Sequence, residues 1–141
     1  MKIAIGTDDG KTIREGHFGS SRYYRIIEIL NGEITGSELR GNPHVKIEND
    51  SGHHGETGKV VDLLKDCSLF IAGSMGKKSS SEITAKHIDC IITKFKTVDL
   101  AVSKYLQGKN EGFKFYDADS GKFTSCSERE KKIELQKSRY E

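Results

Sequence analysis

Three observations in the sequence predict an α/β fold with a mixed sheet. Short apolar segments without alternation, at residues 3–5 and 69–72, are typical of central strands covered on both faces. The second of these runs through Gly73-Ser74-Met75-Gly76 into a helical segment and then a strand at 89–93, which predicts a right-handed crossover between parallel strands. Asn31-Gly32 lies between two further β segments, and it supplies the two positive φ angles of a type I′ hairpin turn.

Five strands and three helices account for most of the chain. The sheet is expected to be mostly five-stranded, with strands at residues 3–5, 23–30, 34–39, 69–72 and 89–93. One helix is expected from Thr57, because apolar residues recur there at three- and four-residue steps. The other two are expected at residues 77–86 and from Thr97 to a stop at Gly108.

The length of 141 residues fits one core domain. We expect an α/β domain at residues 1–109, followed at 110–141 by a C-terminal hairpin and a charged tail. The hairpin is predicted because apolar segments flank Asp119-Ser120-Gly121. The tail has a poor apolar stripe, so we expect a frayed or partner-dependent helix there.

The charge pattern argues against large polyanionic partners. The formal net charge is +2, and the basic and acidic residues are interspersed, so neither nucleic acid nor an anionic membrane is expected as a partner. No stretch approaches the ~20 apolar residues of a membrane-spanning helix, and the N-terminus enters a strand at once. We therefore expect a soluble cytoplasmic protein.

A glycine-rich loop carries the first candidate ligand. In Gly16-His17-Phe18-Gly19 the imidazole of His17 is not needed for strand packing, so it is free to coordinate a metal. Phe18 could shield one side of a bound group, and the two glycines allow close approach and unusual φ angles. The alternative is a loop histidine that hydrogen-bonds a neighbouring carbonyl.

A second polar loop, residues 40–55, carries His44, His53 and His54. His53 and His54 are adjacent, so in extended backbone they point to opposite sides and only one can share a ligand with His17. We expect one of them to be a metal ligand, and the alternative is two solvated histidines.

The turn Gly73-Ser74-Met75-Gly76 is the second candidate binding element. Its backbone amides stand at a helix N-terminus, which is a ready anion site. Because loops at the carboxyl ends of parallel strands converge, this turn should meet the His17 loop. Met75 could line the pocket, although packing under its helix is the simpler interpretation. The alternative for the whole turn is tight strand-to-helix turning with nothing bound.

The three cysteines are far apart and form no C-x-x-C pair. Cys67 and Cys90 lie in apolar surroundings and are interpreted as small buried hydrophobes. Cys126 lies near basic residues in the sequence, which would favour a thiolate, so it is the one candidate sulfur ligand.

The order of four segments resembles the dinitrogenase iron-molybdenum cofactor biosynthesis family. They are Met1-Lys2-Ile3-Ala4-Ile5-Gly6, Gly16-His17-Phe18-Gly19, His53-His54-Gly55 and Phe70-Ile71-Ala72-Gly73-Ser74-Met75-Gly76. The resemblance implies a ribonuclease H-like three-layer fold and binding of iron-sulfur or iron-molybdenum clusters. It also implies cofactor-assembly or acceptor proteins as partners, for a nitrogenase-related monomer or homodimer.

The hypothesis is therefore a non-catalytic carrier of a metallocluster. Two other functions stay open at this point. The adjacent Asp8 and Asp9 suggest a metal-dependent nuclease of ribonuclease H-like fold, although such chemistry needs several carboxylates that converge on metals ~4 Å apart. A phosphate or small-anion binding module could use Gly73 to Gly76, but it does not explain the clustered histidines.

Overall fold

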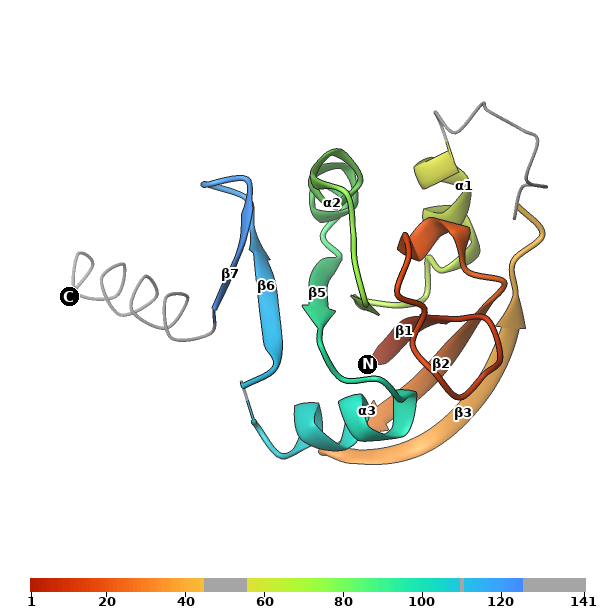
Figure 1. Ribbon diagram of the computed structural model, residues 1–141. Coiled ribbons are helices and arrows are strands. Elements are labelled where there is room, and N and C mark those ends of the chain that lie inside the picture. The colour runs from red at the N-terminus through yellow and green to blue at the C-terminus, as the bar shows by residue number, and fades with distance from the viewer. Residues whose placement is uncertain (45–55, 110, 126–141) are drawn as a thin grey trace.

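The computed structural model describes residues 1–44, 56–109 and 111–125. In this part of the chain seven strands form one mixed sheet in the order β3-β2-β1-β4-β5-β6-β7 (Figure 1). The strands are β1 (Lys2–Thr7), β2 (Tyr23–Leu30), β3 (Glu33–Gly41), β4 (Leu69–Ala72), β5 (Asp89–Thr93), β6 (Phe113–Asp117) and β7 (Lys122–Ser125). The helices are α1 (Glu56–Leu63), α2 (Lys77–Thr84) and α3 (Val98–Leu106), with a short 3-10 turn η1 (Phe18–Ser20).

The centre of the sheet is the predicted parallel set. β1 pairs with β4 and β4 pairs with β5, both parallel, with Ile5 opposite Ile71 and Ile71 opposite Ile91. The side chains of Ile3, Ala4 and Ile5 are fully buried, which is the result of cover on both faces. The prediction of a central first strand is confirmed.

The predicted hairpin forms one edge of the sheet. β2 and β3 are antiparallel, and the turn between them has positive φ at Asn31 (54°) and Gly32 (78°). These are the two left-handed positions that the dipeptide predicts. β3 is an edge strand, and all its residues are exposed or half-buried.

The expected five-stranded sheet is wrong, because the C-terminal hairpin belongs to the same sheet. β6 pairs antiparallel with β5, with Thr93 opposite Phe113, and β7 pairs with β6. Phe113 is 5% exposed and packs in the core, so the hairpin is held by apolar burial as well as by backbone hydrogen bonds.

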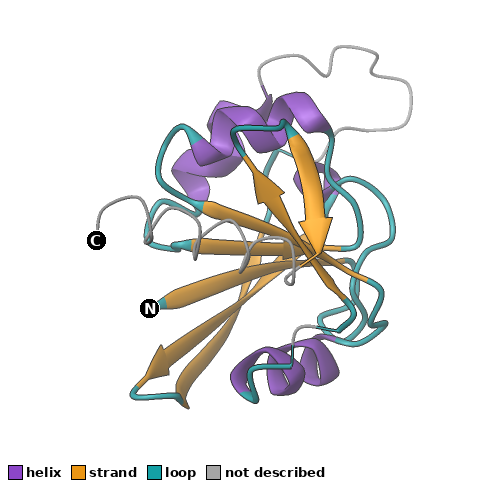
Figure 2. Cartoon of the chain, turned by 90° about the vertical axis from the view of Figure 1, so that its left-hand side faces the viewer, coloured by secondary structure: helices purple, strands orange, loops and turns teal. Residues whose placement is uncertain are grey.

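The three predicted helices cover both faces of the sheet (Figure 2). α1 and α2 pack on one face over a core that contains Leu64, Phe70 and Ile83. α3 packs on the other face over Ile3, Ile5 and Ile71. None of the described helices is long and apolar enough to cross a membrane.

The helix boundaries follow the local signals. Thr97 caps α3, because its side-chain oxygen accepts a hydrogen bond from the Leu100 amide at 3.3 Å. The positive φ of Gly108 (72°) follows the end of that helix. α2 ends at Thr84, two residues before the expected Lys86.

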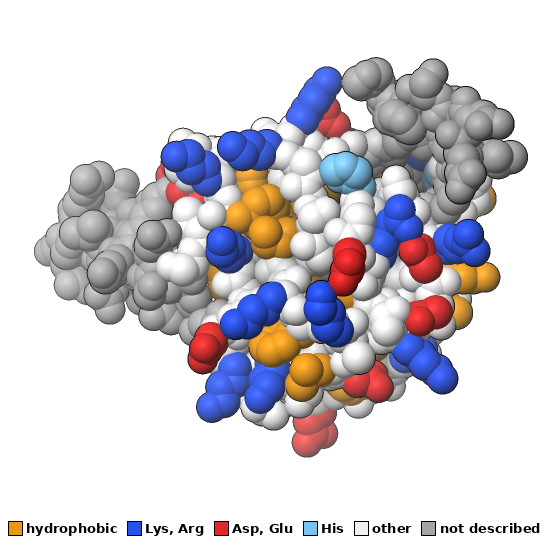
Figure 3. Space-filling view, in the orientation of Figure 1, with side chains coloured by type: hydrophobic (Ala, Val, Ile, Leu, Met, Phe, Trp, Pro, Cys, Tyr) orange, Lys and Arg blue, Asp and Glu red, His pale blue; other side chains and the backbone are white. Residues whose placement is uncertain are grey.

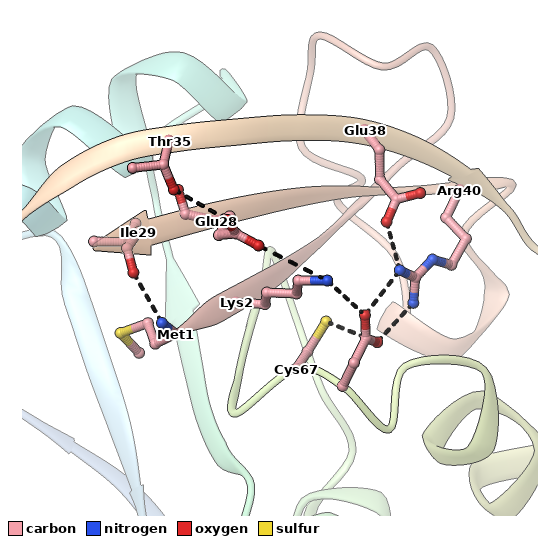
Figure 4. A network of polar contacts seen from close by, with 9 residues as sticks. Met1, Lys2, Glu28, Ile29, Thr35, Glu38, Arg40 and Cys67 are labelled. Carbon is pink, nitrogen blue, oxygen red and sulfur yellow. Dashed lines mark hydrogen bonds and ion pairs between the residues drawn. The ribbon is translucent and has the colours of Figure 1, made fainter.

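The surface carries basic and acidic side chains side by side (Figure 3). One polar network joins three separate parts of the chain (Figure 4). Asp66, which follows α1, accepts hydrogen bonds from Lys2 of β1 at 3.2 Å and from Arg40 of β3 at 2.8 and 3.0 Å. Arg40 also donates to the Leu63 carbonyl at 2.9 Å and pairs with Glu38. The network therefore fixes the end of α1 against strands β1 and β3.

Candidate functional site

Two loops meet where the parallel strands end. The loop after β1 carries His17, and the loop after β4 carries Ser74; these two residues form an isolated parallel bridge. Bridge partners have backbones about 5 Å apart. The expectation that these two loops converge is therefore confirmed. The contact places His17 beside Ser74, which lies two positions before Gly76, the N-cap of α2.

Gly73 makes this approach possible. A Cβ added at Gly73 would lie 2.5 Å from the Arg14 carbonyl oxygen, closer than real Cβ atoms come to a backbone atom, and 3.1 Å from the Glu15 Cα, which is also tight. The glycine is required by close packing and not by its φ angle. Gly16 and Gly19 were expected to adopt unusual φ angles, but neither is among the residues with positive φ.

The His17 loop is fixed to the core through Phe18. The Phe18 ring is 3% exposed and stacks on Phe70 with ring centroids 4.8 Å apart. Its carbonyl accepts hydrogen bonds from the Tyr24 hydroxyl at 2.9 Å and the Ser21 hydroxyl at 2.8 Å. The expectation that Phe18 shields a ligand at the surface is therefore wrong. Its buried ring anchors the loop instead. His17, with φ −60° and ψ 137°, is exposed.

Asn42 joins the two histidine-bearing segments, and sequence reasoning missed it. Its side-chain amide donates to the carbonyls of Ser21 at 2.9 Å and Gly19 at 3.2 Å. Its side-chain oxygen accepts from the His44 amide at 3.0 Å. Asn42 is 8% exposed, so these bonds are made in a largely dry environment where each is costly to lose. Nothing in the sequence distinguishes it from other loop asparagines.

The N-terminus of α2 is electropositive. Gly76 is the N-cap and offers no side chain to the helix, whose first backbone acceptor bond runs from the Ser80 amide to the Gly76 carbonyl at 2.9 Å. The amides of residues 77–79 therefore have no acceptor within the helix. The first turn contains no acidic residue, and Lys77 and Lys78 are both exposed there. Two lysines beside the positive end of a helix dipole are unfavourable unless an anion is present.

The two aspartates after β1 are committed to local structure. Asp9 accepts hydrogen bonds from the amides of Lys11 at 2.8 Å and Thr12 at 2.7 Å. Led by the Thr12 amide, these bonds hold the pKa of Asp9 well below its usual range. Asp8 pairs with Arg14 at 2.5 Å and accepts from the Arg22 amide. Within the described ranges, no group of three or more His, Cys, Asp or Glu side chains could hold a metal ion.

The remaining residues considered in the sequence are the cysteines, Met75, His53 and His54. Cys67 and Cys90 are buried as expected, and burial raises the pKa of each thiol to about 12, which makes them poor ligands. Met75 is half-buried and packs against the core cluster that includes Ile83 of α2. His53, His54 and Cys126 lie outside the residues that the structure describes.

Relatives of the chain are found in sequence and in structure. The uncharacterized protein MJ0580 of Methanocaldococcus jannaschii is 30% identical over 117 residues, which cover 80% of this chain and 92% of that protein. The crystal structure of PH0822 matches with a TM-score of 0.64 at 20% identity, over 84% of this chain and 98% of that one. The apo form of the orange protein from Desulfovibrio gigas matches with a TM-score of 0.61 at 18% identity, over 77% and 88%. At these identities the two structural matches show a shared fold.

The match that identifies the chain covers both loops of the candidate site. The model of the dinitrogenase iron-molybdenum cofactor family aligns with residues 1–108, which run from β1 to the end of α3 and include His17 and Gly73 to Gly76. More than half of the sequence is matched in this way, and the chain therefore belongs to the dinitrogenase iron-molybdenum cofactor family.

Proposed function

We propose that this protein carries an iron-sulfur or iron-molybdenum type cluster and passes it to a cofactor-assembly or acceptor protein, without catalysing a reaction. Family membership links the chain to the iron-molybdenum cofactor pathway. The observation that carries the proposal is the bridge between His17 and Ser74. It joins the backbone of an exposed histidine, whose imidazole could coordinate iron, to the segment that leads into α2, whose first amides would offset the negative charge of a cluster.

The residues at this edge fit an anionic cargo better than a bare cation. His17 supplies a nitrogen ligand, while Lys77, Lys78 and the first amides of α2 supply positive charge and hydrogen-bond donors. The family resemblance implies a ribonuclease H-like layer arrangement. In layered α/β folds, ligands bind at the carboxyl ends of the parallel strands, where the His17 and Ser74 loops meet. In this proposal His53 or His54 provides a second imidazole, and Cys126 a thiolate, toward the same cargo.

A phosphate or small-anion module is the second candidate, favoured by the uncapped N-terminus of α2. Inorganic phosphate discriminates between the two functions in an isothermal titration. A carrier of clusters binds iron and sulfide with His17 dependence and binds phosphate weakly. A phosphate module binds phosphate through Lys77 and Lys78 whether or not His17 is present. The nuclease alternative has less support, because Asp8 and Asp9 are already paired.

Anaerobic reconstitution with ferrous iron and sulfide tests the carrier function. Iron and sulfide content and the visible absorption spectrum are measured for the wild type and for His17→Ala. We expect His17→Ala to lower cluster occupancy at least about tenfold, because it removes a direct ligand. Binding should also weaken in acid, because an imidazole coordinates iron only when it is neutral.

His87 provides the matched control. It is an exposed histidine beyond the opposite end of α2, about 12 Å away along an eight-residue helix. It has a positive φ of 65°, so the control is His87→Asn, because asparagine tolerates that backbone conformation. His87→Asn should bind like the wild type. Equal occupancy in wild type and His17→Ala would remove the basis of the proposal, and loss of binding in Cys126→Ser alone would indicate a sulfur site instead.

A further inference from the structure

β3 is an exposed edge with a mixed apolar and charged surface. Its only strand neighbour among the described residues is β2. Ile34 and Leu39 of this strand are 52% and 47% exposed. An edge strand of nine residues, whose outer side faces no other strand in the described ranges, is a template for pairing with another strand. The question is which strand it fits.

A β-bulge decides which side chains of β3 share a face. The pairing of β3 with β2 shifts between Gly36 opposite Glu28 and Ile34 opposite Ile29, so Thr35 is the extra residue. Because of this residue, Ile34 and Leu39 lie on the same face although they are five positions apart. Ile34 is opposite Ile29, which belongs to the core on the α3 side of the sheet. Leu39 is opposite Arg25, two positions from Ile27 on that same side.

We infer that β3 pairs antiparallel with β3 of a second copy, about a two-fold axis through Ser37. Ser37 then faces Ser37 of the second copy, and Gly36 faces Glu38. Beyond the bulge the register shifts by one residue, which keeps every pair on a common face of the sheet. Ile34 faces Leu39 of the second copy, and Glu33 faces Arg40.

This pairing places complementary residues opposite each other on both sides of the two-fold axis. The two Ile34–Leu39 pairs bury the apolar side chains that are exposed in the single chain. The two Glu33–Arg40 pairs join opposite charges, and Arg40 is already held in place by Asp66 and Glu38. Glu38 meets a glycine, so no like charges are directly opposed. A surface that complements itself in this way is the requirement for a two-fold dimer.

The dimer leaves the candidate cluster sites separate. β4 is three strands from β3 in each copy, so seven strand spacings, about 34 Å, separate the two β4 strands along the continuous sheet. The second copy therefore adds no ligand to the His17 site. Dimerisation should be unaffected by His17→Ala, which makes failure of this inference distinguishable from failure of the proposed function.

Light scattering after size-exclusion chromatography measures the association. The wild type at about 100 µM should have twice the 15.7 kDa mass of one chain. The double variant Ile34→Lys, Leu39→Lys should be monomeric, because it places lysine opposite lysine in a pair that was apolar. Leu30→Lys is the matched control, since Leu30 is 61% exposed but lies on β2 and outside the proposed interface. It should remain dimeric.

Disulfide trapping tests the register, in a Cys126→Ser background and with a mild thiol oxidant added; the other two cysteines are buried. Ser37→Cys should cross-link to itself, because directly opposed residues have Cα atoms about 5 Å apart. Ile34→Cys alone and Leu39→Cys alone should not cross-link, whereas their mixture should. A monomeric wild type overturns the inference, and so does a dimer that Ser37→Cys does not trap.

Discussion

The direction of the His17 side chain depends on its neighbour. Phe18 is held in the core by Phe70 and by hydrogen bonds to its own carbonyl. Successive side chains of extended backbone point to opposite sides, and His17 has extended φ and ψ angles. With Phe18 directed inward, His17 is directed outward toward solvent. The aromatic residue next to the histidine therefore acts as its anchor.

Substitution of Gly73 tests whether stability and cluster binding depend on the close approach of the two loops. Gly73→Ala places a Cβ 2.5 Å from the Arg14 carbonyl, so the loops must separate. We expect a loss of about 1–3 kcal/mol in the free energy of unfolding, which is typical of overpacking, together with a loss of cluster occupancy. Chemical denaturation and the iron and sulfide assay measure the two effects.

Gly58→Ala is the control for the same chemical change. Gly58 lies within α1, and an added Cβ meets no atom within 4 Å. Alanine there should stabilise the protein by about 0.5–1 kcal/mol, because glycine is a poor helix residue, and it should leave binding unchanged. If Gly73→Ala behaved like Gly58→Ala, the close approach of Gly73 to Arg14 would not contribute to the free energy of unfolding.

At the scale of elements, sequence patterns were sufficient where a local signal fixes the backbone. Asn31-Gly32 predicted the hairpin and Thr97 predicted the cap of α3, because each depends on a few adjacent residues. The attachment of β6 to β5 was missed, because pairing between distant strands has no local signature. The bulge at Thr35, which lies within the predicted hairpin, was missed as well.

In the candidate site, too, one feature was predictable from the sequence and another was not. The convergence of the His17 and Ser74 loops followed from the general behaviour of parallel strands. The role of Asn42 did not, because its partners are carbonyls about 20 residues away in the sequence. Lys77 and Lys78 could have been recognised, because they directly follow the glycine turn that was predicted to bind anions.

A carboxylate at the N-terminus of α2 should raise the stability of the protein and lower its cluster occupancy. Gly76→Asp places a carboxylate at the N-cap, in a position where an added Cβ meets nothing within 4 Å. The carboxylate accepts from the first amides of the helix and compensates Lys77 and Lys78, so the protein without cargo should gain about 1 kcal/mol. The same carboxylate occupies the amides and repels an anionic cluster, so occupancy should fall.

Thermal unfolding and the reconstitution assay measure this pair of effects. Thr97→Asp is the control, because it also places a carboxylate at an N-cap, but on α3, which packs on the opposite face of the sheet from α2. It should leave cluster occupancy unchanged. A Gly76→Asp protein that binds as much iron and sulfide as the wild type would exclude the helix amides from the site.

At the scale of the whole molecule, the Asp66 network joins elements that are far apart in the chain. Lys2, Arg40 and Asp66 come from β1, from β3 and from the segment after α1. The hydrogen bonds from Arg40, followed by the one from Lys2, hold the pKa of Asp66 well below its usual value of 3.8. The ionised carboxylate is therefore the form that the folded state favours.

This shift determines how stability depends on pH. A carboxylate with a lowered pKa in the folded state contributes its stability fully above the unfolded value, near pH 4. The contribution decreases as pH falls below that value, because the unfolded chain takes up the proton first. Asp66→Asn should lower the free energy of unfolding at pH 7 by about 1 kcal/mol, a modest figure because the side chain is partly exposed. The difference from the wild type should be constant from pH 7 to pH 5 and should shrink below pH 4.

Asp62→Asn is the control, because Asp62 is an exposed carboxylate on α1. This variant should lose less free energy of unfolding at pH 7 than Asp66→Asn does. Urea unfolding of the three proteins at pH 7, 5 and 3 measures these differences, and a constant gap between wild type and Asp66→Asn down to pH 3 would contradict the assignment of the acid-sensitive contact to Asp66.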